Sequence, residues 1–275
     1  MVDITKCLVL ILLLHRHALT CQGQLITKGN QSHSHHQIKE GCPDHCICVE
    51  RINILCQGVD LKGFPEGLPE DTQTLFLKGN KIGSLDNTPY LPNLKWLVLS
   101  NNKITDIKIE NFNLVLDLGA LEMASNQIKI ANISVFSNLL NLQFLNLSKN
   151  NISTMILSRL PPSMDWIRLD GNLISSVKVD PSFYKNTRHV KINLSHNPIN
   201  CDCSLMTFLQ KANATVIGTC RSPDHLFGIS LNETDDFSLC EMENTKNNAN
   251  ATGNYEKNIF LLLTVVFTVE TMIFL

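Results

Sequence analysis

The sequence has few charged residues, no surplus of basic residues and no motif of a familiar enzyme. Charged residues make up 17% of the 275 positions, and 23 lysines and arginines stand against 25 acids, for a formal net charge of -2. A chain without a basic surplus is poorly suited to neutralise a phosphate backbone, so no nucleic acid is expected as a partner. The sequence contains no GxSxG, HExxH, GxxxxGK or GxGxxG pattern. We therefore expect no enzyme, no cofactor and no metal site.

An apolar run near the start of the chain has the layout of a secretory signal. Residues 7–14 (CLVLILLL) are followed by the polar stretch HRHALTCQG, and this run is too short for a helix across a bilayer, which needs about 20 residues. Cleavage after Gly23 is favoured over cleavage after Thr20, because it removes both Cys7 and Cys21. We expect a signal peptide at residues 1–23 and a polar linker at 24–40.

A second apolar run, residues 259–275, ends the sequence without a lysine or arginine beyond it. Small residues between Asn248 and Gly253, followed by a polar spacer, give residues 241–258 the layout of a stalk with a lipid-anchor attachment region. We expect attachment of the anchor at Asn248. A short transmembrane helix is the alternative, and Glu270 inside the run departs from the anchor pattern. Either arrangement tethers the body outside the cell, at the outer face of the plasma membrane.

The middle of the chain, residues 72–199, repeats the pattern LxxLxLxxNxI six times in strong or weaker copies. Its asparagines step by 22, 24, 24, 22 and 25 residues, at Asn80, Asn102, Asn126, Asn150, Asn172 and Asn197. Leucines two positions apart point to one side of a strand, which must be buried by a neighbouring copy. The asparagines are expected to satisfy backbone groups of adjacent coils rather than to take part in chemistry.

This pattern resembles the extracellular leucine-rich-repeat family. The resemblance implies an α/β solenoid, a right-handed horseshoe with a parallel concave sheet and disulfide-bonded caps. Large residues ten or eleven positions after the asparagines are expected to pack inside the convex side. They are Tyr90, Phe112, Phe136, Leu160 and Phe183.

Cysteines cluster on both sides of the repeats, where an open stack needs caps. The clusters lie in residues 41–71 and 200–240, and the sequence alone permits three pairings in each. They resemble the flanking modules of extracellular leucine-rich-repeat proteins, and the resemblance implies the pairs Cys42–Cys48, Cys46–Cys56, Cys201–Cys220 and Cys203–Cys240. Zinc bound by His45, Cys46 and Cys48 is the rival interpretation, which an oxidising compartment disfavours. A short helix over residues 204–211 should cover the last repeat.

The residues that alternate with the inward leucines are predicted to project from the concave sheet. Both tryptophans of the chain fall on this face. Exposed aromatic residues beside an arginine are typical of protein-interface hot spots. The candidate contact residues are Trp96, Phe144, Trp166 and Arg168.

Eight Asn-x-Ser/Thr sequons indicate a secreted glycoprotein, since each glycan must lie on the surface. The one at Asn250 competes with the anchor site, and those at Asn146 and Asn193 fall on the predicted concave face, where glycans would obstruct a partner. The expected glycosylation sites are Asn30, Asn132, Asn146, Asn151, Asn193, Asn213 and Asn232.

The layout of cap, repeats, cap and tether is similar to that of Nogo receptor and variable lymphocyte receptor proteins. The resemblance implies a cell-surface protein of adhesion or recognition that binds another extracellular protein and signals, if at all, through a co-receptor. Two alternatives stay open, a secreted matrix protein and an innate immune pattern-recognition receptor.

Overall fold

The computed structural model describes residues 42–185 and 188–232, all of which belong to one compact unit. The predicted signal peptide, polar linker, stalk and C-terminal apolar segment lie outside the described residues, as do Asn30, Cys240, Asn248 and Asn250. Among the residues described, no helix is long and apolar enough to cross a membrane.

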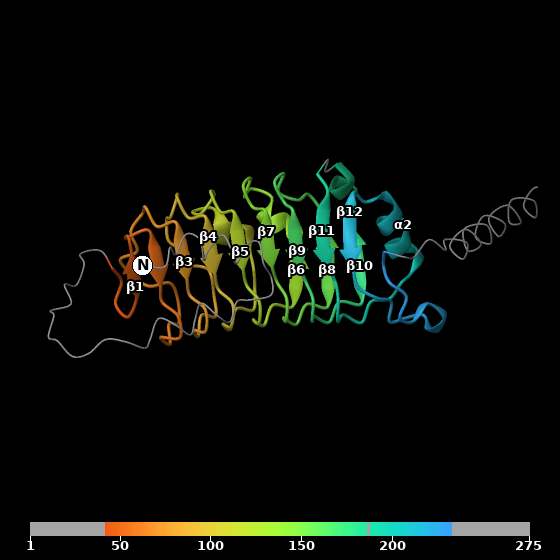
Figure 1. The fold of residues 1–275 in the computed structure, drawn as a ribbon, viewed down its shortest axis with the longest axis horizontal. Coiled ribbons are helices and arrows are strands. Elements are labelled where there is room, and N and C mark those ends of the chain that lie inside the picture. The colour runs from red at the N-terminus through yellow and green to blue at the C-terminus, as the bar shows by residue number, and fades with distance from the viewer. Residues whose placement is uncertain (1–41, 186–187, 233–275) are drawn as a thin grey trace, which may run out of the picture. The chain divides into compact units, whose positions relative to one another are not determined.

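One side of the unit is a nine-stranded sheet that runs through the repeats and both caps (Figure 1). The strands lie in chain order and pair in parallel, apart from the antiparallel first pair. The six strands predicted for the repeats are therefore extended by three that the caps supply. The strands are β1 (Ile47–Val49), β2 (Asn53–Leu55), β3 (Thr74–Phe76), β4 (Trp96–Val98), β5 (Ala120–Glu122), β7 (Phe144–Asn146), β9 (Trp166–Arg168), β11 (Val190–Asn193) and β12 (Ala214–Ile217).

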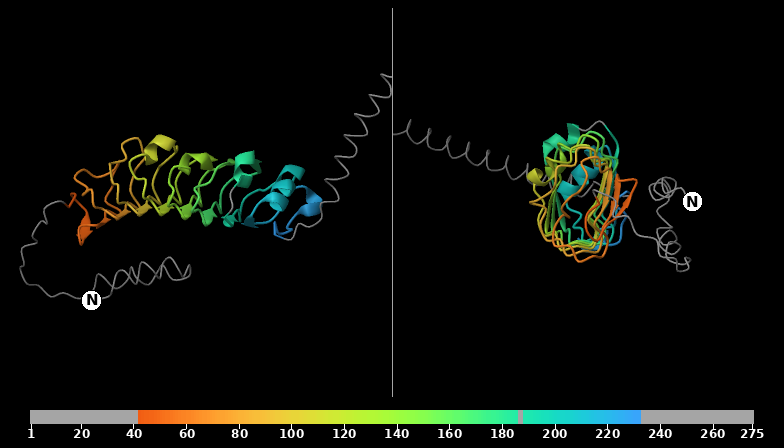
Figure 2. Two further views of the ribbon diagram at one scale, coloured as in Figure 1. Left: turned by 90° about the horizontal axis from the view of Figure 1, so that it is seen from above. Right: turned by 90° about the vertical axis from the view of Figure 1, so that its left-hand side faces the viewer.

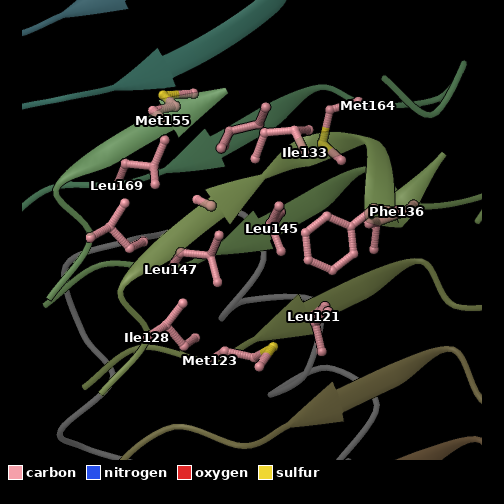
Figure 3. Packing of buried hydrophobic residues seen from close by; sticks show 14 of the residues in the cluster. Leu121, Met123, Ile128, Ile133, Phe136, Leu145, Leu147, Met155, Met164 and Leu169 are labelled. Atoms are coloured by element: carbon pink, nitrogen blue, oxygen red, sulfur yellow. The ribbon is translucent and has the colours of Figure 1, made fainter. Parts of the chain in front are cut away.

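The central residue of each repeat strand points into the core. Leu97 of β4 aligns with Leu121 of β5, which aligns with Leu145 of β7, and all three are at most 1% exposed. Figure 3 shows Leu121, Leu145 and Phe136 directed into the same interior. Each coil thus buries its apolar side only against its neighbours, which confirms the predicted leucine-rich-repeat solenoid.

The asparagines of the pattern form a ladder along the core. In one rung, Asn102 Nδ2 donates to the carbonyl oxygens of Leu77 and Leu99, each at 2.9 Å, and Asn102 Oδ1 accepts from the Ile82 N–H at 3.0 Å. The residue before each asparagine has a positive φ, between 55° and 74°. This left-handed turn follows each repeat strand, and six positions share it: Gly79, Asn101, Ser125, Lys149, Gly171 and His196.

The opposite, convex side carries short 3-10 helices and a second sheet (Figure 2). The helices are η1 (Ile109–Phe112), η2 (Ile133–Phe136) and η3 (Pro181–Lys185), and the parallel three-stranded sheet consists of β6 (Ile130–Asn132), β8 (Thr154–Leu157) and β10 (Ser176–Val179).

Four of the five residues predicted to pack inside this side are buried: Phe112, Phe136, Leu160 and Phe183. The prediction for Tyr90 is wrong, because Tyr90 is 56% exposed and its neighbour Leu91 is buried instead. The Leu91 N–H donates to the Leu114 carbonyl of the next coil at 3.0 Å.

Disulfides hold both caps. The bonds are Cys42–Cys48, Cys46–Cys56 and Cys201–Cys220, the pairs that the family resemblance implies. Cys203 is also disulfide-bonded, and its pairing with Cys240 stays a prediction. Because Cys46 and Cys48 are oxidised, neither can supply a thiolate to zinc, and the rival zinc interpretation is wrong.

An α-helix in the C-terminal cap covers the last repeat. Helix α2 spans Cys203–Lys211 and begins at Asp202, whose side chain accepts from the Leu205 N–H at 2.9 Å. The buried Phe208 contacts Phe183 of η3, with ring centroids 5.5 Å apart. The C-terminal cap also contains the short helix η4 (Asp224–Leu226).

Candidate functional site

The outward side of the nine-stranded sheet, here called the concave face, presents three rows of side chains from the repeats. Parallel pairing in register places equivalent residues of successive strands next to one another. The first row is Thr74, Trp96, Ala120, Phe144, Trp166 and Lys191; the second is Phe76, Val98, Glu122, Asn146, Arg168 and Asn193; the third is Lys78, Ser100, Ala124, Ser148, Asp170 and Ser195.

The aromatic residues of this face form two pairs. The ring centroids of Phe76 and Trp96 are 5.2 Å apart, and those of Phe144 and Trp166 are 5.7 Å apart in an edge-to-face arrangement. Phe144 and Trp166 are partly exposed. The structure thus brings three of the candidate contact residues, Phe144, Trp166 and Arg168, into one cluster on β7 and β9.

Arg168 is fixed within this cluster. Its Nε and Nη2 donate to the two carboxylate oxygens of Asp170 at 3.1 and 3.2 Å, and Asn193 Nδ2 donates to the same carboxylate at 3.3 Å. The guanidinium carbon lies 6.0 Å from the Trp166 ring centroid, and Lys191 Nζ lies 5.2 Å from it. A bidentate pair and cation–π contacts hold these side chains in one geometry before any partner arrives.

Trp96 differs from its prediction as an exposed contact residue, because it is only 8% exposed. Its neighbour in the first row, Ala120, has a small side chain, and Phe76 packs against the indole ring. The indole N–H is buried and makes no hydrogen bond with the described residues.

Glu122 lies on the concave face, as its place in the repeat predicts, but its partial burial was not predicted. Burial raises the pKa of its carboxyl, an effect opposed by the Trp96 indole and by the charges of Lys78 and Arg168. Within residues 42–185 and 188–232, no ion pair shorter than 4.0 Å involves Glu122. The sequence does show a difference in local charge between the two acids. Arg168 comes two residues before Asp170, whereas β5 contains no basic residue beside Glu122.

The sequons differ in how accessible their asparagines are. Asn146 is 6% exposed, and its Oδ1 accepts from the backbone N–H and the hydroxyl of Ser148 at 3.1 and 2.7 Å. A glycan there would have to displace this packed arrangement, so we no longer expect one at Asn146. Asn132 and Asn193 are half-buried. The exposed acceptors are Asn151, Asn213 and Asn232.

Comparison with known proteins supports the repeats. Models of the leucine-rich repeat match residues 92–152 and 141–164. The chain is 32% identical over 88 residues to reticulon-4 receptor-like 1 of Mus musculus, and 33% identical over 91 residues to podocan of the same species. It is also 28% identical over 176 residues, 62% of the chain, to leucine-rich repeat-containing protein 3 of Danio rerio.

These similarities cover limited parts of the relatives. The aligned segments are 32% of this chain in the first two cases and span 20% and 15% of the respective relatives; in the third case they span 48%. The chain therefore matches less than half of the length of each of these proteins.

Proposed function

Because the chain is a leucine-rich-repeat protein with cysteine-rich flanking modules, we propose that it is a non-enzymatic glycoprotein of the cell surface that binds another protein through its concave face. The role is adhesion or receptor recognition, with an extracellular or cell-surface protein as the partner and a co-receptor for any signal. The tether is a lipid anchor attached at Asn248, in preference to a short transmembrane helix.

The observation that carries the proposal is the cluster formed by Phe144, Trp166 and Arg168. Aromatic and arginine side chains dominate the binding energy of protein interfaces when they lie together in a well-packed patch. Here the cluster is held by the contacts with Asp170 and Lys191, so a partner meets side chains that are already ordered. Little rotamer entropy remains to be lost on binding.

The position outside the cell has separate support. Disulfides at both ends require an oxidising compartment, and one relative, reticulon-4 receptor-like 1, is named as a receptor-like protein. Similarity to podocan gives some weight to the alternative of a secreted matrix protein. Treating expressing cells with a phospholipase that cleaves lipid anchors separates the two: release by the enzyme supports the anchor, and protein already in the medium supports the matrix alternative.

The binding role is tested with the full chain expressed on cells and probed with a library of extracellular proteins. For any protein captured, Phe144→Ala and Trp166→Ala should each weaken binding by about 10-fold or more. Tyr90→Ala is the matched control, because Tyr90 is an exposed aromatic residue outside the concave face. Unchanged binding by both concave-face variants, at wild-type levels of surface expression, would contradict the proposal.

A further inference from the structure

We propose that Glu122 is an anchor for a lysine or arginine side chain of the protein partner. This inference rests on the proposed binding role of the concave face and adds the chemistry of the partner.

The position of Glu122 suits an anchor. It lies in the second row of the concave face, paired in register with Val98 on one side and Asn146 on the other. Val98 and Asn146 are buried, while Glu122 is only partly so. Glu122 is therefore partly exposed between buried neighbours. A charged group that reaches its carboxylate from outside displaces little water and interacts with it strongly.

The two acids of the face differ in how well their charge is compensated. Asp170 accepts two hydrogen bonds from Arg168 and one from Asn193. Glu122 has no ion pair within 4.0 Å among the described side chains; Lys78 and Arg168 act on it only at longer range, and Arg168 is already engaged by Asp170. A desolvated carboxylate in this state gains most from a cation that approaches closely.

The C-terminal half of the concave face has an arginine at the position where the N-terminal half has a valine. There an indole, a cation and a carboxylate occur together as Trp166, Arg168 and Asp170. Around β4 and β5 the indole of Trp96 and the carboxylate of Glu122 are present, and the equivalent of Arg168 is Val98. A lysine or arginine from the partner would complete the same set of contacts.

The chemistry of the surroundings favours a basic side chain over a metal ion. Within the part of the chain that the structure describes, no three metal-ligating side chains come together. The first-row neighbours of Glu122 are alanine and aromatic residues, which can line the stem of a lysine or arginine.

The test uses the purified full chain and fluorescein-labelled peptides of sequence Gly-Gly-X-Gly-Gly, capped at both ends, with X as lysine, arginine, glutamine or glutamate. Fluorescence anisotropy should detect binding of the lysine and arginine peptides and none of the other two. Glu122→Gln should weaken binding by about 10-fold or more, since a charge-assisted contact is lost. Glu110→Gln is the matched control, because Glu110 is an exposed acid of η1 on the convex side.

Other outcomes bear directly on the anchor. Equal binding of the glutamine peptide, or wild-type binding by Glu122→Gln, would overturn it. If a captured partner binds Glu122→Gln as well as wild type but loses binding to Trp166→Ala, the anchor is wrong and the concave-face function stands. If it binds both variants as wild type does, the concave-face function itself fails.

Discussion

Replacing Asn102 with alanine removes one rung of the asparagine ladder and tests how the repeats are held together. Asn102 is 7% exposed and lies far from any sequon, so the substitution changes neither the surface nor the glycans. Its side chain makes three strong contacts, two donated to carbonyl oxygens and one accepted from the Ile82 N–H.

The cost follows from which groups lose their last partner. The Leu77 carbonyl keeps the Nδ2 of Asn80, and the Leu99 carbonyl keeps the Nδ2 of Asn126. Only the Ile82 N–H is left without an acceptor. An orphaned buried donor costs about 1 to 3 kcal/mol, and the two shared bonds add less than a full bond each, so we expect a loss of about 2 to 4 kcal/mol in the free energy of unfolding.

Urea unfolding of the full chain with intact disulfides, followed by far-UV circular dichroism, measures this loss. Asn93→Ala is the control, because Asn93 is exposed and makes one weak contact, from Nδ2 to the Glu70 carbonyl at 3.3 Å. The control should remain within about 0.5 kcal/mol of wild type. If Asn102→Ala were equally mild, the ladder would not contribute to stability and the reasoning from unsatisfied groups would be refuted.

Three further predictions follow from single features. Burial raises the pKa of Glu122, so the contribution of this residue to stability is fully present below its unfolded-state pKa and is lost as pH rises through the raised value. Relative to wild type, Glu122→Gln should therefore unfold at higher urea at about pH 7 and at the same urea at about pH 3. Gly79 has φ 74°, so Gly79→Ala should lower the free energy of unfolding by about 1 kcal/mol in the same assay. Gly83→Ala is the control, because Gly83 has open space around it and no positive φ, and it should cause no measurable change. Glycopeptide mass spectrometry should find Asn146 unmodified, and glycan there would contradict its buried geometry; the sites expected to carry glycan are Asn151, Asn213 and Asn232.

The repeats could be predicted from the sequence because each coil is specified locally. Leucine spacing determines which side of a strand is buried, and the asparagine marks the turn that follows. The partners of Asn102 lie in the same coil and the preceding one, so knowledge of the period is enough to place them. The caps followed from the cysteine spacing through the family resemblance.

The misses concern properties that depend on neighbouring coils. Tyr90 and Leu91 are both large, and their positions in the sequence do not show that Leu91 is the buried one and Tyr90 the exposed one. Trp96 lies at an outward position of the repeat, yet it packs against Phe76 and is only 8% exposed. The convex sheet of β6, β8 and β10 has no repeated sequence signature, and Glu122 acquires its character from side chains on other strands.

The ladder has a bearing on how such a chain can change length. Each rung takes its donors and acceptors from its own coil and the one before it, and every repeat strand meets the next in the same register. An interior coil can therefore be duplicated or excised as a unit, with the ends still sealed by their cystines. The length of the concave face is then set by the number of copies, without redesign of any one of them.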